Sequence, residues 1–103
     1  MSELGNKRNK FTECVANLID YMLSEGYNPR LGRDGLPHMK NSLHFQGLAV
    51  DIDLIKDGKY LSKTEDHKKF GEYWESLDED CRWGGRFKNP DGNHYSVTYG
   101  GKS

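Results

Sequence analysis

The spacing of apolar residues along the chain predicts two amphipathic helices. In the first, apolar side chains recur every three or four positions from Phe11 to Leu23, which is the spacing of one helix face. Gly26 follows and is expected to end this helix. The second stripe consists of Phe70, Tyr73, Trp74 and Leu77. Thr64, with two acidic residues after it, is the expected N-cap of this second helix.

Alternation of apolar and polar residues predicts the strands. Residues 48–55 place Leu48, Val50, Ile52 and Leu54 on one face and Ala49, Asp51, Asp53 and Ile55 on the other. Asp57 and Gly58 predict a turn, after which residues 59–61 are expected to pair back as a hairpin. A second Asp-Gly turn precedes a final strand over residues 94–99. Residues 27–41 contain two prolines and several glycines and predict a loop with at most a short extended piece.

The order helix, loop, strand pair, helix, strand predicts an α+β fold with an antiparallel sheet. We expect residues 1–103 to form one domain, because a chain of this length leaves no room for two. Charged residues make up 30% of the chain and hydrophobic ones 34%, so the core is small and a bound metal would help to stabilise it.

Charge and hydropathy narrow the classes of partner. The formal net charge of −1 argues against a nucleic-acid binder. No stretch approaches the ~20 apolar residues of a membrane span, and the polar first ten residues do not form a secretory signal. We therefore expect a cytoplasmic monomer without stable membrane association. Cys14 and Cys81 belong to no CxxC motif, and two buried free thiols are favoured over a disulfide.

Three residues, His44, Asp51 and His94, form a candidate metal site. Asp51 and Asp53 share a strand face, where their repulsion calls for a cation, solvent or an arginine partner. His44 lies seven residues before Asp51, or about 23 Å along an extended chain, so the two meet only if the chain bends, for which Gly47 supplies freedom. His94 is the third candidate, and three protein ligands with one open position are typical of catalytic zinc.

Asp91 precedes His94 by three residues, across the Asp-Gly turn. This position would place a carboxylate near the metal without requiring that it ligate, as suits a general base. The competing interpretation is that Asp91 only forms the turn.

Two sequence motifs resemble a family of zinc peptidases. The segment from Ser42 to Asp53, SLHFQGLAVDID, resembles the SxHxxGxAxD signature of the VanY-type D-alanyl-D-alanine carboxypeptidases and the phage L-alanyl-D-glutamate endolysins. The later segments WGGRF (83–87) and DGNH (91–94) are similar to the WGGxF and [DE]xxH motifs of that family. The motifs occur in the family's order and lie within residues 30–98.

The resemblance implies a hedgehog/D-Ala-D-Ala peptidase-like fold and Zn2+ bound by His44, Asp51 and His94, with Asp91 as the catalytic acid/base. An arginine before the SxH motif would hold substrate or stabilise the oxyanion; Arg33 is our choice and Arg30 the alternative. Aspartate at position 91 is closer to the phage endopeptidases, since the carboxypeptidases usually carry glutamate there. The implied substrate is the peptidoglycan stem peptide, cut at the L-alanyl–D-glutamate bond by an endolysin that leaves the cytoplasm through a membrane pore.

Other functions stay open at this stage. The protein could be a D-alanyl-D-alanine carboxypeptidase or dipeptidase, a catalytically silent zinc-stabilised domain that binds cell-wall peptides, or a metal-free structural protein. Among the remaining histidines, His38 is expected in a solvated loop and His67 in a structural or exposed position. Trp83 is expected either to pack under the metal site or to line the cleft.

Overall fold

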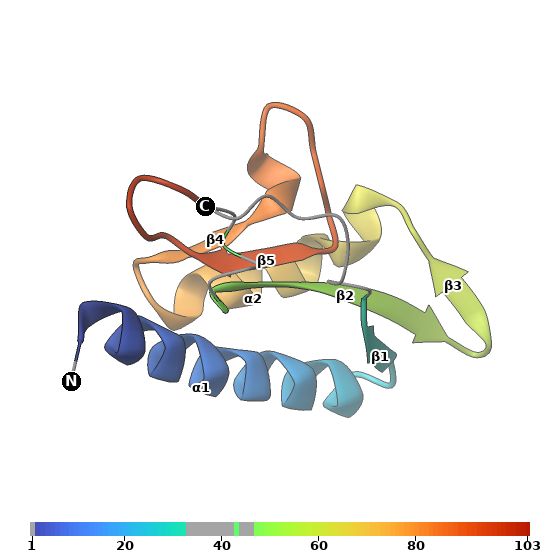
Figure 1. Cartoon of the computed structure of the whole chain (residues 1–103). Coiled ribbons are helices and arrows are strands. Elements are labelled where there is room, and N and C mark those ends of the chain that lie inside the picture. The colour runs from blue at the N-terminus through green and yellow to red at the C-terminus, as the bar shows by residue number, and fades with distance from the viewer. Residues whose placement is uncertain (1, 33–42, 44–46) are drawn as a thin grey trace.

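A computed structural model describes residues 2–32, 43 and 47–103 of the chain. It begins with a long helix, α1, over Glu3–Ser24, whose first turn is capped by the Ser2 hydroxyl. Gly26 follows with a positive φ of 89°, a conformation that glycine adopts without steric cost. The predicted first helix and its glycine stop are therefore confirmed, and α1 runs along one side of the molecule (Figure 1).

The sheet contains five antiparallel strands in the described residues, β1 (Asn28–Leu31), β2 (Ala49–Lys56), β3 (Lys59–Leu61), β4 (Cys81–Trp83) and β5 (His94–Val97). Their order is β1-β2-β5-β4, and β3 also pairs with β2. The first half of β2 pairs with β5, while its second half pairs with β1 and β3. Among the described strands, every pairing except that between β4 and β5 therefore involves β2.

The second helix, α2, spans Lys68–Leu77 and follows a 3-10 turn, η1, over Thr64–His67. The predicted N-cap at Thr64 is wrong, because Thr64 is already the first residue of the 3-10 turn. Lys63 takes the capping position, and its backbone N–H donates to the Asp66 carboxylate at 3.1 Å. The acidic residues therefore act at the start of a 3-10 turn, and the α-helix begins three residues later than expected.

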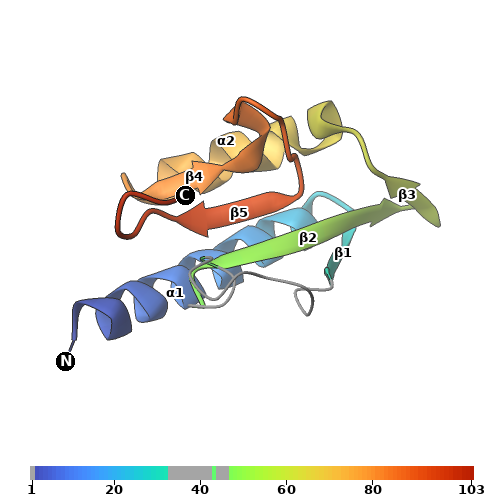
Figure 2. The same ribbon diagram turned by 45° about the horizontal axis from the view of Figure 1, so that its top comes forward.

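The core lies where α1 and α2 meet the apolar face of β2 (Figure 2). Leu48, Ile52 and Leu54 on that face are fully buried, as their alternation predicted. Trp74 on α2 is also fully buried, and its indole N–H donates to the Ser96 carbonyl at 2.9 Å. The Ser96 carbonyl on β5 therefore has a hydrogen-bond partner within the core, as burial demands.

Cys14 and Cys81 are both buried and both free thiols, as expected. Burial raises the pKa of each thiol, so neither has the thiolate character of a reactive cysteine. No helix within the described ranges has a stretch long and apolar enough to cross a membrane.

The strand predictions need two corrections. β4 was not predicted, and β5 ends at Val97 instead of residue 99. The short extended piece allowed within residues 27–41 is β1. All four β5 residues are buried, so the strand has no exposed polar face despite its alternating sequence. β4 has only three residues with an exposed arginine at the centre, which is too short for alternation to be recognised.

Candidate metal centre

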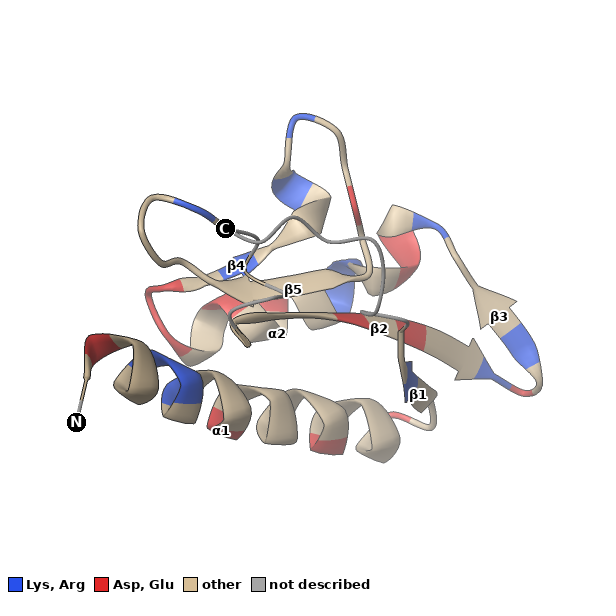
Figure 3. Ribbon diagram, viewed as in Figure 1, with Lys and Arg blue, Asp and Glu red and all other residues tan. Residues whose placement is uncertain are grey.

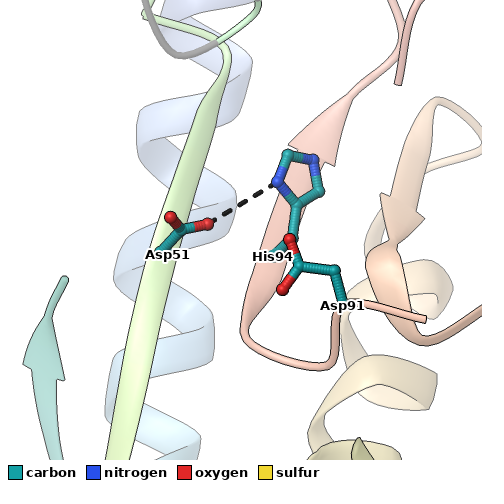
Figure 4. Close-up of side chains that lie close together, drawn as sticks. All are labelled: Asp51, Asp91 and His94. Carbon is teal, nitrogen blue, oxygen red and sulfur yellow. Dashed lines mark ion pairs between the residues drawn. The ribbon is translucent and has the colours of Figure 1, made fainter. Parts of the chain in front are cut away.

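Strand register brings Asp51 and His94 together. The two residues are direct cross-strand partners in the antiparallel pair of β2 and β5, so their side chains leave the same face of the sheet. The Nδ1 atom of His94 lies 3.6 Å from a carboxylate oxygen of Asp51 (Figure 4). Two residues far apart in the sequence therefore offer an oxygen and a nitrogen donor to one point.

The turn before β5 adds Asp91 to this pair. The His94 N–H donates to the Asp91 carbonyl at 3.1 Å and closes the turn, while the Asp91 N–H donates to the Gly84 carbonyl at 2.9 Å. These bonds return the Asp91 side chain to the His94 imidazole (Figure 4). One donor atom from each of Asp51, Asp91 and His94 lies within 4.8 Å of the other two. Asp91 is the exposed member of the three, and His94 is buried.

The donor spacing suits a divalent metal. Zinc binds histidine nitrogen and carboxylate oxygen at about 2.0–2.2 Å, so two tetrahedral ligands stand roughly 3.4 Å apart. The 3.6 Å between His94 and Asp51 is close to that spacing. Asp91 can either complete the ligand set or stand beside it, because the 4.8 Å limit accommodates both arrangements. Carboxylate and imidazole donors also suit other divalent ions.

Close packing holds the His94 ring and the Asp91 turn in place. The Phe87 ring lies against the His94 imidazole, with ring centroids 5.4 Å apart. A Cβ atom on Gly84 would stand 2.2 Å from the Asp91 carbonyl oxygen and 2.8 Å from the His94 Cβ. Only glycine therefore lets the 3-10 turn η2 (Gly84–Arg86) approach the metal centre this closely.

Trp83 packs beneath the 91–94 turn and also borders a second pocket, beside Thr64 and Arg86. Its side chain is buried, and the indole N–H donates to the Gly92 carbonyl at 2.7 Å. Gly71 and Gly85 both press against the ring, where an added Cβ would meet its atoms at 2.0 and 2.3 Å. The indole thus supports the 91–94 turn from below, which agrees with the first of the two roles expected for Trp83.

His67 is structural, as predicted. It is buried, and its Nδ1 atom lies 2.9 Å from the Tyr95 hydroxyl. Burial lowers the pKa of His67 to about 4, against a smaller opposing effect of Asp66 and Asp53. Burial also raises the pKa of Tyr95, so the hydrogen bond joins a protonated hydroxyl and a neutral imidazole. This bond joins η1 to β5 one residue from His94.

A cavity of about 570 Å³ adjoins the centre, lined by Arg30, Leu31, Gly32, Asp51, Asp53 and Asn93. Arg30 is the cross-strand partner of Asp53, and their side chains lie 3.8 Å apart. Asp53 therefore has the arginine partner that was one of its three expected solutions. Sequence reasoning did not assign Asn93 a role, although its place beside His94 was a usable signal.

Three predicted residues lie outside the described part of the chain. They are the zinc ligand His44, the substrate arginine Arg33 and the loop residue His38. Their roles stay predictions, and so do the individual roles assigned to Asp51, Asp91 and His94.

The fold and the site define a small α+β protein with a carboxylate–histidine centre fit for a divalent metal. The model of a protein family described as D-alanyl-D-alanine carboxypeptidase matches residues 37–97. The chain belongs to this peptidase family, which confirms the family predicted from the motifs. A comparison with curated protein sequences gave no match.

Among solved structures, the chain is similar to the crystal structure of the Serratia marcescens L-Ala D-Glu endopeptidase ChiX. The TM-score is 0.63 at 16% sequence identity, over 94% of this chain and 87% of the other. At this identity the likeness shows a shared fold, which agrees with the predicted fold class.

Proposed function

We propose that this protein is a zinc-dependent peptidase that hydrolyses the L-alanyl–D-glutamate bond of the peptidoglycan stem peptide. The observation that carries the proposal is the Asp51–His94 pair, 3.6 Å apart, with the Asp91 carboxylate beside it in a chain of a peptidase family. Zinc held by His44, Asp51 and His94 would polarise the scissile carbonyl and lower the pKa of a bound water toward ~7.

Asp91 is the proposed acid/base. It is the most exposed residue of the cluster, so both water and substrate reach it. Its carboxylate accepts the proton of the attacking water and then delivers that proton to the leaving nitrogen, which departs as an amine. Arg33 is proposed to stabilise the oxyanion. In this assignment the buried His94 would hold the zinc ion in position, and the exposed Asp91 would carry out the proton transfers.

The choice of bond rests on two observations. Aspartate at position 91 resembles the phage endopeptidases, and the protein of similar fold is titled an L-Ala D-Glu endopeptidase. We further propose that residues 1–103 act as one monomeric endolysin domain, made in the cytoplasm of an infected bacterium and released to the wall through a membrane pore.

Carboxypeptidase activity on D-alanyl-D-alanine is the second candidate, because the matching family carries that description. The two activities leave different products. Mass spectrometry of peptidoglycan fragments after incubation with zinc-loaded protein separates them: new fragments beginning at D-glutamate indicate the endopeptidase, whereas loss of terminal D-alanine indicates the carboxypeptidase.

The variant Asp91→Asn tests the catalytic assignment. Hydrolysis should fall by about 100-fold or more, while binding of the peptide is retained. Asp57→Asn is the matched control, since Asp57 is an exposed residue in the turn between β2 and β3. Intact fragments with the wild-type protein, despite bound zinc, would reject hydrolysis and favour a binding domain.

A further inference from the structure

Glu75 contacts both ends of a short backbone segment beside the metal centre. It lies on α2, and its side chain is only 21% exposed. One oxygen of its carboxylate accepts the Trp83 backbone N–H at 3.2 Å, and the other accepts the Nε–H of Arg86. Figure 3 colours the acidic residues of α2 red and the arginine of η2 blue. A single carboxylate from the helix therefore holds residues 83–86, which comprise the end of β4 and the whole of η2.

The position of β4 in the sheet explains why Trp83 needs this partner. Among the described strands, β4 is an edge strand that pairs only with β5, so one side of its backbone has no neighbouring strand. Trp83 is buried, and a buried backbone N–H requires an acceptor. Glu75 supplies that acceptor and also binds the Arg86 guanidinium, which lies over the Trp83 ring at 5.7 Å from its centre. Trp83 is thus held through both its backbone and its indole.

Trp83 and Gly84 in turn hold the turn that carries Asp91. The Gly84 carbonyl accepts the Asp91 N–H at 2.9 Å, and the Trp83 indole N–H donates to the Gly92 carbonyl at 2.7 Å. One bond therefore fixes the backbone before the Asp91 side chain, and the other fixes it after that side chain. The place of the Asp91 carboxylate depends on residues 83 and 84, and through them on Glu75.

We propose that Glu75 is a positioning residue for the proton transfers of Asp91. It lies outside the carboxylate–histidine cluster and acts on it through the backbone of Trp83 and Gly84. This inference rests on the proposed peptidase function and adds to it a residue that lies outside both sequence motifs. Misplacement of a reacting group by about 1 Å can lower a rate by about 100-fold. Loss of Glu75 should therefore act on kcat more than on KM.

A double-mutant cycle with Asp91 tests this role. Glu75→Ala alone should lower kcat about 10- to 100-fold with a smaller change in KM. In the Asp91→Asn background it should change kcat by about twofold or less, because the group that it positions no longer transfers protons. Glu72→Ala, at an exposed glutamate one turn earlier on α2, is the matched control and should leave kcat unchanged.

A purely structural role for Glu75 predicts a different result. Glu75→Ala would then lower kcat by the same factor in both backgrounds, and that outcome would overturn the proposal. If Glu75→Ala does not fold, Glu75→Gln, which keeps one acceptor oxygen, is measured in the same cycle.

Amide hydrogen exchange separates this inference from the proposed function, because it requires no substrate. In Glu75→Ala, the Asp91 amide should exchange about 10-fold faster or more, since its bond to the Gly84 carbonyl opens more often. The Val97 amide, which donates to the Leu48 carbonyl at 3.0 Å, is the internal control and should be unaffected. Faster exchange at Asp91 alone, in a protein that cleaves no peptide, would reject hydrolysis and keep the positioning of Asp91 by Glu75. Equal acceleration of both amides, or of neither, would overturn the positioning.

Discussion

Asp51 and His94 are direct partners across β2 and β5, and their donor atoms lie 3.6 Å apart. An antiparallel pair sets partner Cα atoms about 4.5–5.5 Å apart, so the spacing of the donors follows from the sheet itself. The sheet therefore fixes the distance between the two candidate ligand atoms without help from a metal. A site arranged in this way loses little conformational entropy on binding.

Metal binding should stabilise the fold through this pair. At a zinc concentration of 100 times Kd, binding to the native state contributes about 2.7 kcal/mol, which corresponds to a rise in Tm of about 10 °C or more. Asp51→Ala should abolish most of this rise, whereas Asp57→Asn should preserve it. Differential scanning calorimetry with and without zinc measures the difference. An equal rise in Asp51→Ala would show that Asp51 is not a ligand.

Gly84→Ala should damage the site through the backbone of Asp91. The new methyl group would stand 2.2 Å from the Asp91 carbonyl oxygen, and overpacking of this kind costs about 1–3 kcal/mol. Because the turn must shift, metal affinity and hydrolysis should both decrease. Gly58→Ala is the control: it is strained by its positive φ of 77° but meets no atom within 4 Å. Chemical denaturation and metal titration of both variants measure these effects. If Gly84→Ala and Gly58→Ala bound the metal with the same affinity, the prediction would be contradicted.

Trp83→Phe should weaken the support beneath the 91–94 turn. The substitution removes the indole N–H that donates to the Gly92 carbonyl at 2.7 Å, and a buried carbonyl left without its donor costs about 1–3 kcal/mol. Chemical denaturation measures this loss. Trp74→Phe provides a comparison, since its indole N–H donates to the Ser96 carbonyl in the core. Both variants should lose stability, but only Trp83→Phe should also lose metal affinity.

Stability should decrease as the pH falls from about 6.5 toward 4, the pKa to which burial lowers His67. The unfolded chain binds a proton at His67 in this range and the native state does not, so the slope of unfolding free energy against pH is positive. The contribution of His67 is complete above its unfolded pKa and amounts to about 3 kcal/mol. Urea titrations at several pH values, compared with His67→Gln, isolate it. An unchanged slope in His67→Gln would refute the assignment.

Much of the fold followed from local pattern. The alternation of β2 and the stripe of α1 were strong enough to predict both elements, and two motifs identified the family. β1 was expected only as a short extended piece because Pro29 and Arg30 interrupt any alternation, and Leu31 is its single aliphatic residue. Its pairing partner on β2, and not its own sequence, makes it a strand.

The site was predicted less completely than the fold. Spacing suggested that Asp91 would lie near His94, because a tight turn returns the chain on itself. The nearness of Arg30 to Asp53 depends on the register between two strands, which no local spacing encodes. His67 was expected to be structural or exposed, and only the packed structure shows its burial against Tyr95.

The shared position of β2 limits how the cavity beside Asp51 can change. One strand carries Asp51, opposite His94, and Asp53, opposite Arg30. Because a strand repeats every two residues, a shift of one residue turns each side chain to the opposite face. The interval between the carboxylate beside His94 and the carboxylate beside Arg30 can therefore change only in steps of about 6.6 Å. Exchange of residues on β1 and β3 would alter the cavity lining around position 53, while the spacing along β2 stays constant.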